Sequence, residues 1–184
     1  MELVDILIRR RVSIVCVQET KWTSEKVRET EDTGFKLYYS GKDRRMNGIE
    51  ILIANGLVEN VVAVIEKGDR IMLIKLIIGE NIVNVVSAYA PPVGLDNQIK
   101  RDFGEQMDAI LQEIPAGENL VIGGDFNSHV GIDKLGYERV HDGYGFGDRN
   151  EAGESILDFA LAYDLVVANS SICKPLRVGQ LRAK

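Results

Sequence analysis

The chain has 184 residues, of which 45% are hydrophobic and 27% charged, and its formal net charge is −6. This length and composition fit one globular domain with its own core, and they exclude fibrous and low-complexity classes. No apolar run approaches the roughly 20 residues that cross a bilayer, so we expect a soluble, intracellular protein with no membrane partner.

Patterns of apolar residues predict the elements along the chain. In the first half they predict, in order, a short amphipathic helix over residues 1–10 and strands over 12–17, 35–39, 48–54, 61–65, 70–78 and 82–89. In the second half they predict a helix from an Asp96 cap to Pro115, a strand over 119–122, a Gly-rich loop over 128–148, a helix that starts at Asn150 and a strand over 165–168. Because strands follow one another with few helices between them, we expect an α/β (α+β) fold, a layered α/β sandwich, and not a doubly wound sheet.

The acidic excess is confined to one part of the chain. Residues 101–150 carry 4 basic and 10 acidic side chains, whereas the remainder is balanced. A protein that coats nucleic acid without sequence preference needs an overall basic face, which this chain does not offer. Arg9, Arg10, Arg11 and the predicted turn at 41–47 are either local basic patches or a solvated helix end and a solvated turn.

Polar residues stand immediately after three of the predicted strands. They are Gln18-Glu19-Thr20, Tyr89-Ala90-Pro91 and Gly124-Asp125-Phe126-Asn127. Residues two apart on an extended segment share a face, so Asp125 and Asn127 are expected to point the same way. Glu19 and Asp125 offer the hard oxygen ligands that Mg²⁺ prefers, and Tyr89 offers a hydrogen bond to a charged oxygen. The plainer interpretations are a solvated turn residue for Glu19, an Asx turn for Asp125 and an anchored aromatic for Tyr89.

Several segments in a fixed order resemble one family. They are Val-Gln-Glu-Thr-Lys-Trp (17–22), Ser-Ala-Tyr-Ala-Pro-Pro-Val-Gly (87–94), Gly-Gly-Asp-Phe-Asn-Ser-His-Val-Gly (123–131), Gly-Phe-Gly-Asp-Arg-Asn-Glu-Ala-Gly-Glu (145–154) and Leu-Asp-Phe-Ala (157–160). The first three resemble the endonuclease/exonuclease/phosphatase superfamily. The last two narrow the resemblance to the apurinic-endonuclease-like domain of non-LTR retrotransposons and to craniofacial development protein 2-like proteins.

The resemblance implies a metal-dependent phosphodiesterase or endonuclease that acts on nucleic acid, DNA above all, with Mg²⁺ or alternatively Mn²⁺ as cofactor. By resemblance, Glu19 is a metal ligand, and Asp125 binds metal and orients or deprotonates the attacking water. Asn127 positions that water and contacts the phosphate, and Tyr89 stabilises charge on the phosphoryl oxygens. Phosphoryl transfer needs mainly positioning and neutralisation of developing charge. A nuclease ancestry also implies a nuclear location by association, and the oligomeric state is left open.

The sequence departs from the family pattern at both ends. It shows no Asn-bearing motif on a first strand and no late Ser-Asp-His motif. Its two histidines, His129 and His141, lie in the Gly-rich region and are expected to be structural or solvent-facing. We therefore expect a sandwich that is incomplete at both ends, with a partial domain over 1–170 and a divergent tail over 171–184.

Three functions follow as hypotheses. The first is a retrotransposon-derived nuclease domain with weak or no activity, because the Ser-Asp-His motif is missing. The second is a working endonuclease in which another group replaces the missing acid. The third is a non-catalytic module that binds nucleic acid or protein. Glu50, in a strand position where the family usually has a small or apolar residue, is expected either to face solvent or to strain the core.

Overall fold

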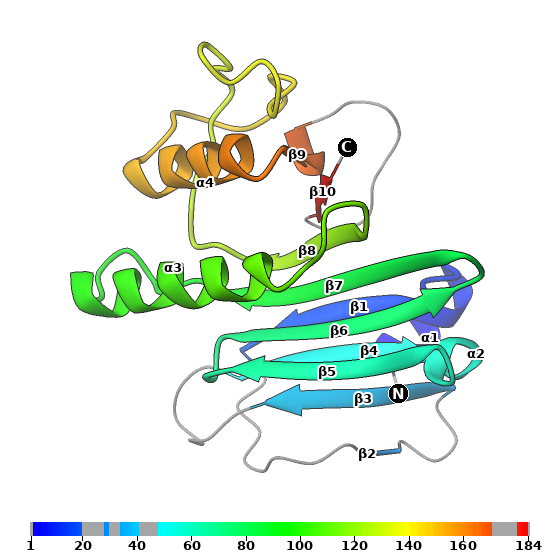
Figure 1. Ribbon diagram of the computed structural model, residues 1–184. Coiled ribbons are helices and arrows are strands. Elements are labelled where there is room, and N and C mark those ends of the chain that lie inside the picture. Colours follow the sequence, from blue (N-terminus) through cyan, green and yellow to red (C-terminus); the bar gives the residue numbers. More distant parts are fainter. Residues whose placement is uncertain (1, 20–27, 30–33, 41–47, 171–179, 184) are drawn as a thin grey trace.

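Two β-sheets stack face to face, and the three longest helices lie on their outer sides (Figure 1). The computed structural model describes residues 2–19, 28–29, 34–40, 48–170 and 180–183. The smaller sheet has the strand order β1-β4-β3-β2, and the larger has the order β5-β6-β7-β8-β10-β9. Within the described residues β7 and β8 are parallel and the other strand pairs are antiparallel.

The strands and helices have the following bounds. The smaller sheet contains β1 (Ile14–Gln18), β2 (Arg28–Glu29), β3 (Phe35–Ser40) and β4 (Ile49–Ala54). The larger sheet contains β5 (Val61–Lys67), β6 (Ile71–Ile78), β7 (Asn81–Tyr89), β8 (Asn119–Asp125), β9 (Leu165–Val167) and β10 (Gln180–Ala183). The helices are α1 (Glu2–Arg9), α2 (Asn55–Val58), α3 (Asn97–Gln112), α4 (Glu151–Ala162) and the 3-10 turn η1 (Ala168–Ser170). α3 lies between β7 and β8 in the chain, because parallel strands need a crossover connection.

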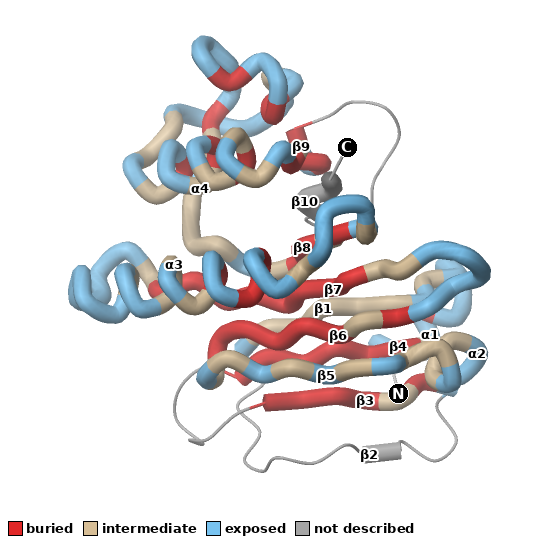
Figure 2. The backbone as a smooth tube through the Cα atoms, in the orientation of Figure 1, coloured by how far each residue is buried: buried red, intermediate tan, exposed pale blue. Residues whose placement is uncertain are grey.

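Three apolar clusters pack the layers against one another. The central cluster lies between the sheets and is built from alternate residues of β4 and β6, namely Ile49, Ile51, Ile53, Met72, Ile74 and Leu76. A second cluster packs α3 and α4 on the outer face of the larger sheet, and a third packs Leu7 of α1 on the outer face of the smaller sheet. Figure 2 shows the result: burial is nearly continuous along β3, residues 71–76 of β6 and most of β7, whereas exposed positions follow the outer sides of α3 and α4.

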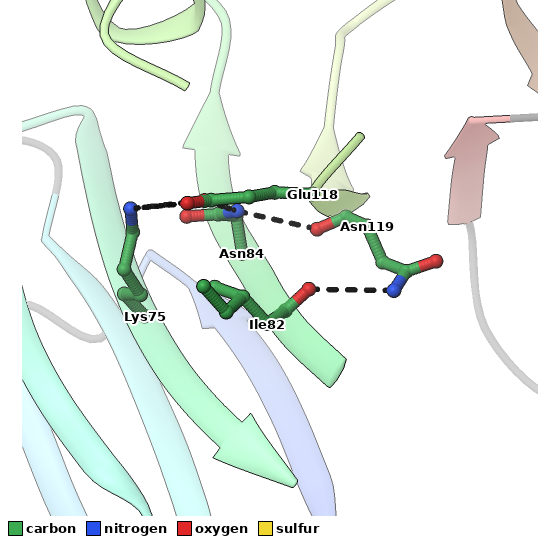
Figure 3. Close-up of polar contacts among 5 residues, drawn as sticks. All are labelled: Lys75, Ile82, Asn84, Glu118 and Asn119. Carbon is green, nitrogen blue, oxygen red and sulfur yellow. Dashed lines mark hydrogen bonds and ion pairs between the residues drawn. The ribbon is translucent and has the colours of Figure 1, made fainter. Parts of the chain in front are cut away.

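A polar cluster ties the parallel pair together where it begins (Figure 3). Glu118, directly before β8, accepts a hydrogen bond from Asn84 Nδ2 at 2.7 Å and forms an ion pair with Lys75 Nζ at 2.9 Å. Asn84 Nδ2 also lies 3.3 Å from the Asn119 carbonyl oxygen, and Asn119 Nδ2 donates to the Ile82 carbonyl oxygen at 3.3 Å. Asn84 and then Lys75 hold the pKa of the Glu118 carboxyl below its usual value. The cluster joins β6, β7 and β8 in one register, and that register determines where β7 and β8 end.

The layered sandwich predicted from the sequence is confirmed. The predicted Asp96 cap is present and accepts from the Gln98 N–H at the start of α3, and Asn150, the predicted start of the second helix, is the cap of α4 and accepts from the Gly153 N–H. The sequence did not predict β2, α2, η1 or β10, each of which has four residues or fewer and is too short to show a period. The turn predicted over 41–47 lies outside the described residues.

Glu50 corrects one expectation. It is only 7% exposed and shares the outer face of β4 with the buried Leu52, so the interpretation that it faces solvent is wrong. Its neighbours in the register are Val17 and Tyr39. In the described part of the chain, no helix has the length and apolar character needed to cross a membrane.

Candidate active site

The ends of β1, β7 and β8 meet at one edge of the sandwich. β7 and β8 run parallel, so their carboxyl ends coincide, and Tyr89 stands opposite Asp125 in the register. The Ala90 N–H donates to the Asp125 carbonyl oxygen at 2.8 Å and closes this ladder. β1 belongs to the other sheet, yet it ends in the same place, because Gln18 Nε2 donates to Ser87 Oγ at 3.2 Å. Three segments that are far apart in the sequence therefore present their next residues to one region.

Glu19 and Tyr89 are in direct contact. The Tyr89 hydroxyl donates a hydrogen bond to Glu19 Oε1 at 2.7 Å. Tyr89 is 6% exposed and its ring belongs to the central core, whereas Glu19 is exposed. Glu19 has a left-handed backbone, with φ at 60°, which turns the chain away from β1. The anchored aromatic expected at Tyr89 is thus present, and its hydroxyl reaches an exposed carboxylate.

A turn, not a continuing strand, brings Asn127 to Asp125. β8 ends at Asp125, and Asn127 is left-handed with φ at 47°. The Asn127 N–H donates to Asp125 Oδ1 at 2.8 Å, which is an Asx turn. The expectation that an extended backbone would align these two side chains is therefore wrong, and the Asx turn is present; it leaves the role of Asp125 as a metal ligand a prediction. Asn127 Nδ2 donates to the Ala90 carbonyl oxygen at 2.7 Å, so the amide lies against the end of β7.

Gly124 allows the two strands to approach each other beside the site. A Cβ atom at this position would lie 1.9 Å from the Ala88 carbonyl oxygen. That distance is far inside van der Waals contact with a backbone atom that cannot move aside, so this position accepts only glycine.

The surroundings keep the Tyr89 phenol in its neutral form. Its hydrogen bond to Glu19, followed by burial, raises the pKa of Tyr89 above its usual value, while the Asn127 amide and the Arg70 guanidinium act in the opposite direction. The net effect is a raised pKa for Tyr89. Tyr89 therefore retains its proton near neutral pH and can donate it in a hydrogen bond.

Arg70 is a member of the site that the sequence analysis did not single out. It stands directly before β6, is 9% exposed and lies behind the Tyr89 ring. The only signal available in the sequence was a cationic residue directly before a long apolar strand, where the aliphatic stem of an arginine can be buried.

The two histidines differ in their surroundings. His141 is 1% exposed, and its Nδ1 accepts a hydrogen bond from the Gly143 N–H at 2.9 Å. Nε2 therefore carries the ring proton and donates it to the Gly131 carbonyl oxygen at 3.1 Å. Burial lowers the pKa of His141, so the ring stays neutral. His129 is exposed. Both histidines were expected to be structural or solvent-facing; His141 is buried in the loop and His129 is exposed.

The structure gathers the four expected residues at one edge, and their donor atoms are all oxygen or amide nitrogen. Glu19 and Asp125 supply carboxylates, Asn127 supplies an amide and Tyr89 a hydroxyl. No three His, Cys, Asp or Glu side chains of the described ranges form a ready cage for an ion. Mg²⁺ is commonly bound through one or two carboxylates and keeps several waters, whereas Zn²⁺ prefers nitrogen and sulfur. The donor chemistry therefore fits Mg²⁺ or Mn²⁺.

Sequence comparisons identify relatives of the chain. The model of the Endonuclease/Exonuclease/phosphatase family matches residues 2–177. Craniofacial development protein 2 of Tragulus javanicus is 27% identical over 171 residues, and that of Bos taurus is 26% identical over 171 residues. These alignments cover 92% of this chain but 29% and 28% of the relatives, so the chain spans less than a third of the length of these curated proteins.

Solved structures share the fold. An AP endonuclease from Archaeoglobus fulgidus matches with a TM-score of 0.63 and 18% identity, over 98% of this chain and 80% of that one. The endonuclease domain of TRAS1, a telomere-specific non-LTR retrotransposon, matches with a TM-score of 0.62 and 16% identity, over 100% of this chain and 74% of that one. At these identities the likeness establishes the sandwich fold.

Proposed function

The chain belongs to the endonuclease/exonuclease/phosphatase family, and we propose on that basis that it is a metal-dependent phosphodiesterase domain of retrotransposon origin that nicks DNA slowly. The observation behind the proposal is the 2.7 Å hydrogen bond from the Tyr89 hydroxyl to Glu19, beside Asp125 at the end of β8. This hydrogen bond joins the neutral Tyr89 hydroxyl, at the end of β7 in the larger sheet, to the Glu19 carboxylate, directly after β1 of the smaller sheet. The endonucleases with the same fold support a nucleic-acid substrate.

Each residue has a distinct task in this proposal. Glu19 and Asp125 would hold a divalent ion, which supplies positive charge against the negative charge that develops on the phosphoryl oxygens. Asp125 is exposed and accepts the proton of the attacking water. Asn127 is fixed to the end of β7 by the hydrogen bond from its amide to the Ala90 carbonyl oxygen, and from there it would position the attacking water and contact the phosphate. Tyr89 has one hydroxyl proton, which it donates to Glu19 in the structure; when substrate binds, the hydroxyl would turn this hydrogen bond from Glu19 to a phosphoryl oxygen.

The histidines explain why we propose slow turnover for the chain as given. The family pattern uses a late histidine at the scissile phosphate. His141 uses both ring nitrogens on loop backbone groups and is buried, and His129 is exposed in the segment after the Asp-Phe-Asn motif. Neither is placed in a late strand. Removing one preorganised donor from such a site lowers the rate by about 10²–10³-fold, and we expect the parent chain to show a deficit of that order relative to a complete site.

Nicking of supercoiled plasmid tests the proposal. The parent chain, Glu19→Gln and Asp125→Ala are compared with Mg²⁺, with Mn²⁺ and with a chelator. The matched control is Glu80→Gln, an exposed carboxylate in the hairpin between β6 and β7, at the far end of β7 from the site. We expect slow metal-dependent nicking in the parent and in Glu80→Gln, and a further loss of about 10²-fold in each site variant.

Two results would contradict the proposed function. One is nicking that survives in both site variants, which would assign the activity to a contaminant. The other is the absence of nicking from protein that is folded, as judged by circular dichroism. In the second case the fold would be retained without catalysis.

A non-catalytic interaction module is the second candidate, and one observation favours it. The loop between β8 and α4 exposes several large apolar side chains, among them Leu135 at 76% and Phe146 at 95%. Internal hydrogen bonds hold the loop, including Ile132 N–H to the Gly147 carbonyl oxygen at 3.3 Å. Exposed apolar groups on an ordered loop are typical of binding surfaces. Nucleic-acid binding that is insensitive both to Mg²⁺ and to Asp125→Ala would favour this candidate.

A further inference from the structure

Arg70 contacts Tyr89 through its backbone and through its side chain. The Tyr89 N–H donates to the Arg70 carbonyl oxygen at 2.9 Å. Arg70 Nη1 donates to the Tyr89 carbonyl oxygen at 3.2 Å, and the guanidinium carbon lies 5.1 Å from the centroid of the Tyr89 ring. One residue therefore engages both backbone groups of Tyr89 and one face of its ring.

The burial of Arg70 requires such contacts. At 9% exposure the guanidinium has lost most of its hydration, which is unfavourable unless its donors and its charge find partners. A carbonyl oxygen satisfies one donor, and the electron-rich face of an aromatic ring attracts the charge most strongly when water is excluded. Both partners belong to Tyr89, so the placement of the guanidinium and the placement of the phenol depend on each other.

We infer that Arg70 is the positioning residue of Tyr89: it fixes the phenol ring at the end of β7 so that the hydroxyl stays on Glu19. The inference rests on the proposed function where it concerns catalysis, but the positioning itself does not depend on turnover. Without the guanidinium, the Tyr89 ring loses its contact on one face, and the Tyr89 carbonyl oxygen loses the hydrogen bond from Arg70 Nη1. The phenol ring is then free to move from its place beside Glu19, and a phosphoryl oxygen would meet a donor that is no longer preorganised.

The geometry also explains why the residue is arginine. A planar guanidinium can lie over a ring and donate from one nitrogen to a carbonyl oxygen at the same time. A lysine ammonium is a point charge that can satisfy either contact but not the same combination. Arg70→Lys is therefore expected to retain part of the positioning, and Arg70→Met, which keeps the apolar stem alone, to lose it.

The first arm of the test needs no activity. Tyrosine labelled with ¹³C at Cζ gives one signal per ring, and Tyr89→Phe assigns the signal of Tyr89. The position of that signal reports the hydrogen bond of the hydroxyl at neutral pH. In Arg70→Met we expect it to move toward its position in Glu19→Ala, where the acceptor is absent, and in Arg70→Lys to move less.

The chain offers a matched control for this arm. Arg149 lies 4.5 Å from the centroid of the Tyr137 ring and donates to the Val130 carbonyl oxygen, in the loop far from β1. Arg149→Met should shift the signal of Tyr137 and leave that of Tyr89 unchanged. The same variant should nick DNA at the parental rate.

The second arm separates positioning from direct contact with DNA. We expect Arg70→Met to lower kcat about 10- to 100-fold with KM changed less than about threefold, and Arg70→Lys to recover part of that loss. In the Tyr89→Phe background, Arg70→Met should cost little more, because a positioning residue acts only through the group it positions. An arginine that binds phosphate itself would raise KM and would add its effect to that of Tyr89→Phe.

The results that would contradict the positioning role differ from those that would contradict the proposed function. An unmoved Tyr89 signal in folded Arg70→Met overturns the inference whether or not the parent nicks DNA. A raised KM that adds to Tyr89→Phe overturns it as well. A parent that does not nick DNA contradicts the proposed function, while the shifted Tyr89 signal still supports the positioning role. If Arg70→Met unfolds, Arg70→Gln, which keeps a donor for the carbonyl but no charge, takes its place with the same expected shift.

Discussion

His141 and His129 are chemically identical residues whose environments differ at the scale of single atoms. His141 accepts from Gly143 and donates to Gly131, so it links two parts of the loop between β8 and α4 only in its neutral form. Protonation would give Nδ1 a hydrogen that faces the Gly143 N–H. Burial acts in the same direction, and the pKa of His141 is lowered.

The sign of the resulting pH dependence follows from proton uptake. As the pH falls below the ordinary histidine range, the unfolded chain binds a proton at residue 141 before the folded chain does, so the free energy of unfolding decreases. We expect the melting temperature of the parent to fall between about pH 7.5 and pH 5.5. His141→Gln, whose amide can both accept and donate a hydrogen bond, should be about 1–2 kcal/mol less stable than the parent. Its melting temperature should also depend much less on pH over this range. His129→Gln is the matched control and should keep the parental slope; equal slopes in both variants would contradict the assignment.

At the scale of elements, the sequence predicted the long elements well. The apolar runs of β6 and β7 and the helical spacing of α3 identify themselves by length and period. The caps Asp96 and Asn150 were predictable because each places a short polar side chain just before a helical pattern. β10 was not predictable, because four residues with polar neighbours show no period, and its place between β8 and β9 depends on tertiary pairing.

The candidate site was predictable in its composition but not in its geometry. Glu19, Tyr89 and Asp125 could be proposed because they come directly after apolar runs, at the ends of predicted strands. The Asx turn at Asn127 and the support of Tyr89 by Arg70 depend on backbone dihedral angles and on which strands become neighbours. Sequence periodicity contains neither kind of information, since it reports faces of isolated elements and not contacts between them.

The register of β7 and β8 leads to a prediction at this scale. Asn84 is fully buried and joins Glu118 to the Asn119 carbonyl oxygen at the start of the parallel pair. Asn84→Ala removes both bonds, and we expect it to cost about 1–3 kcal/mol in urea unfolding. The control is Glu113→Ala, which breaks the surface ion pair with Lys67 and should cost less than about 1 kcal/mol. Equal costs would show that the buried cluster does not fix the register.

Across the whole molecule, the stability is limited by different groups at the two ends of the pH scale. On the acid side, Glu118 has a pKa lowered by Asn84 and Lys75, so the stabilisation it provides is present above the ordinary carboxyl range and is lost as the pH falls. On the alkaline side, groups in separate layers retain their protons in the folded state. Burial raises the pKa of Cys16 in β1 to about 11, and burial together with the hydrogen bond to Asp108 raises that of Tyr163 to about 12.

The loss of stability at alkaline pH is the stronger prediction, because the pKa values of several groups are raised in the folded state. Cys16 and Tyr163 release their protons in the unfolded chain at a lower pH than in the folded one, and the pKa values of Tyr89 and Tyr137 are raised as well. The folded state then binds more protons, so the stability is present below the unfolded pKa values and decreases as the pH rises through about 9 to 12. Melting temperatures measured over this range should fall in the parent.

Tyr163→Phe tests this prediction, because it removes one of these groups without charge change at neutral pH; its melting temperature should decline less steeply than that of the parent. Phe159→Leu is the control, because it disturbs the neighbouring ring and no titrating group; its melting temperature should decline in parallel with the parent. Parallel curves for all three proteins would show that burial and the hydrogen bond to Asp108 do not raise the pKa of Tyr163 in solution.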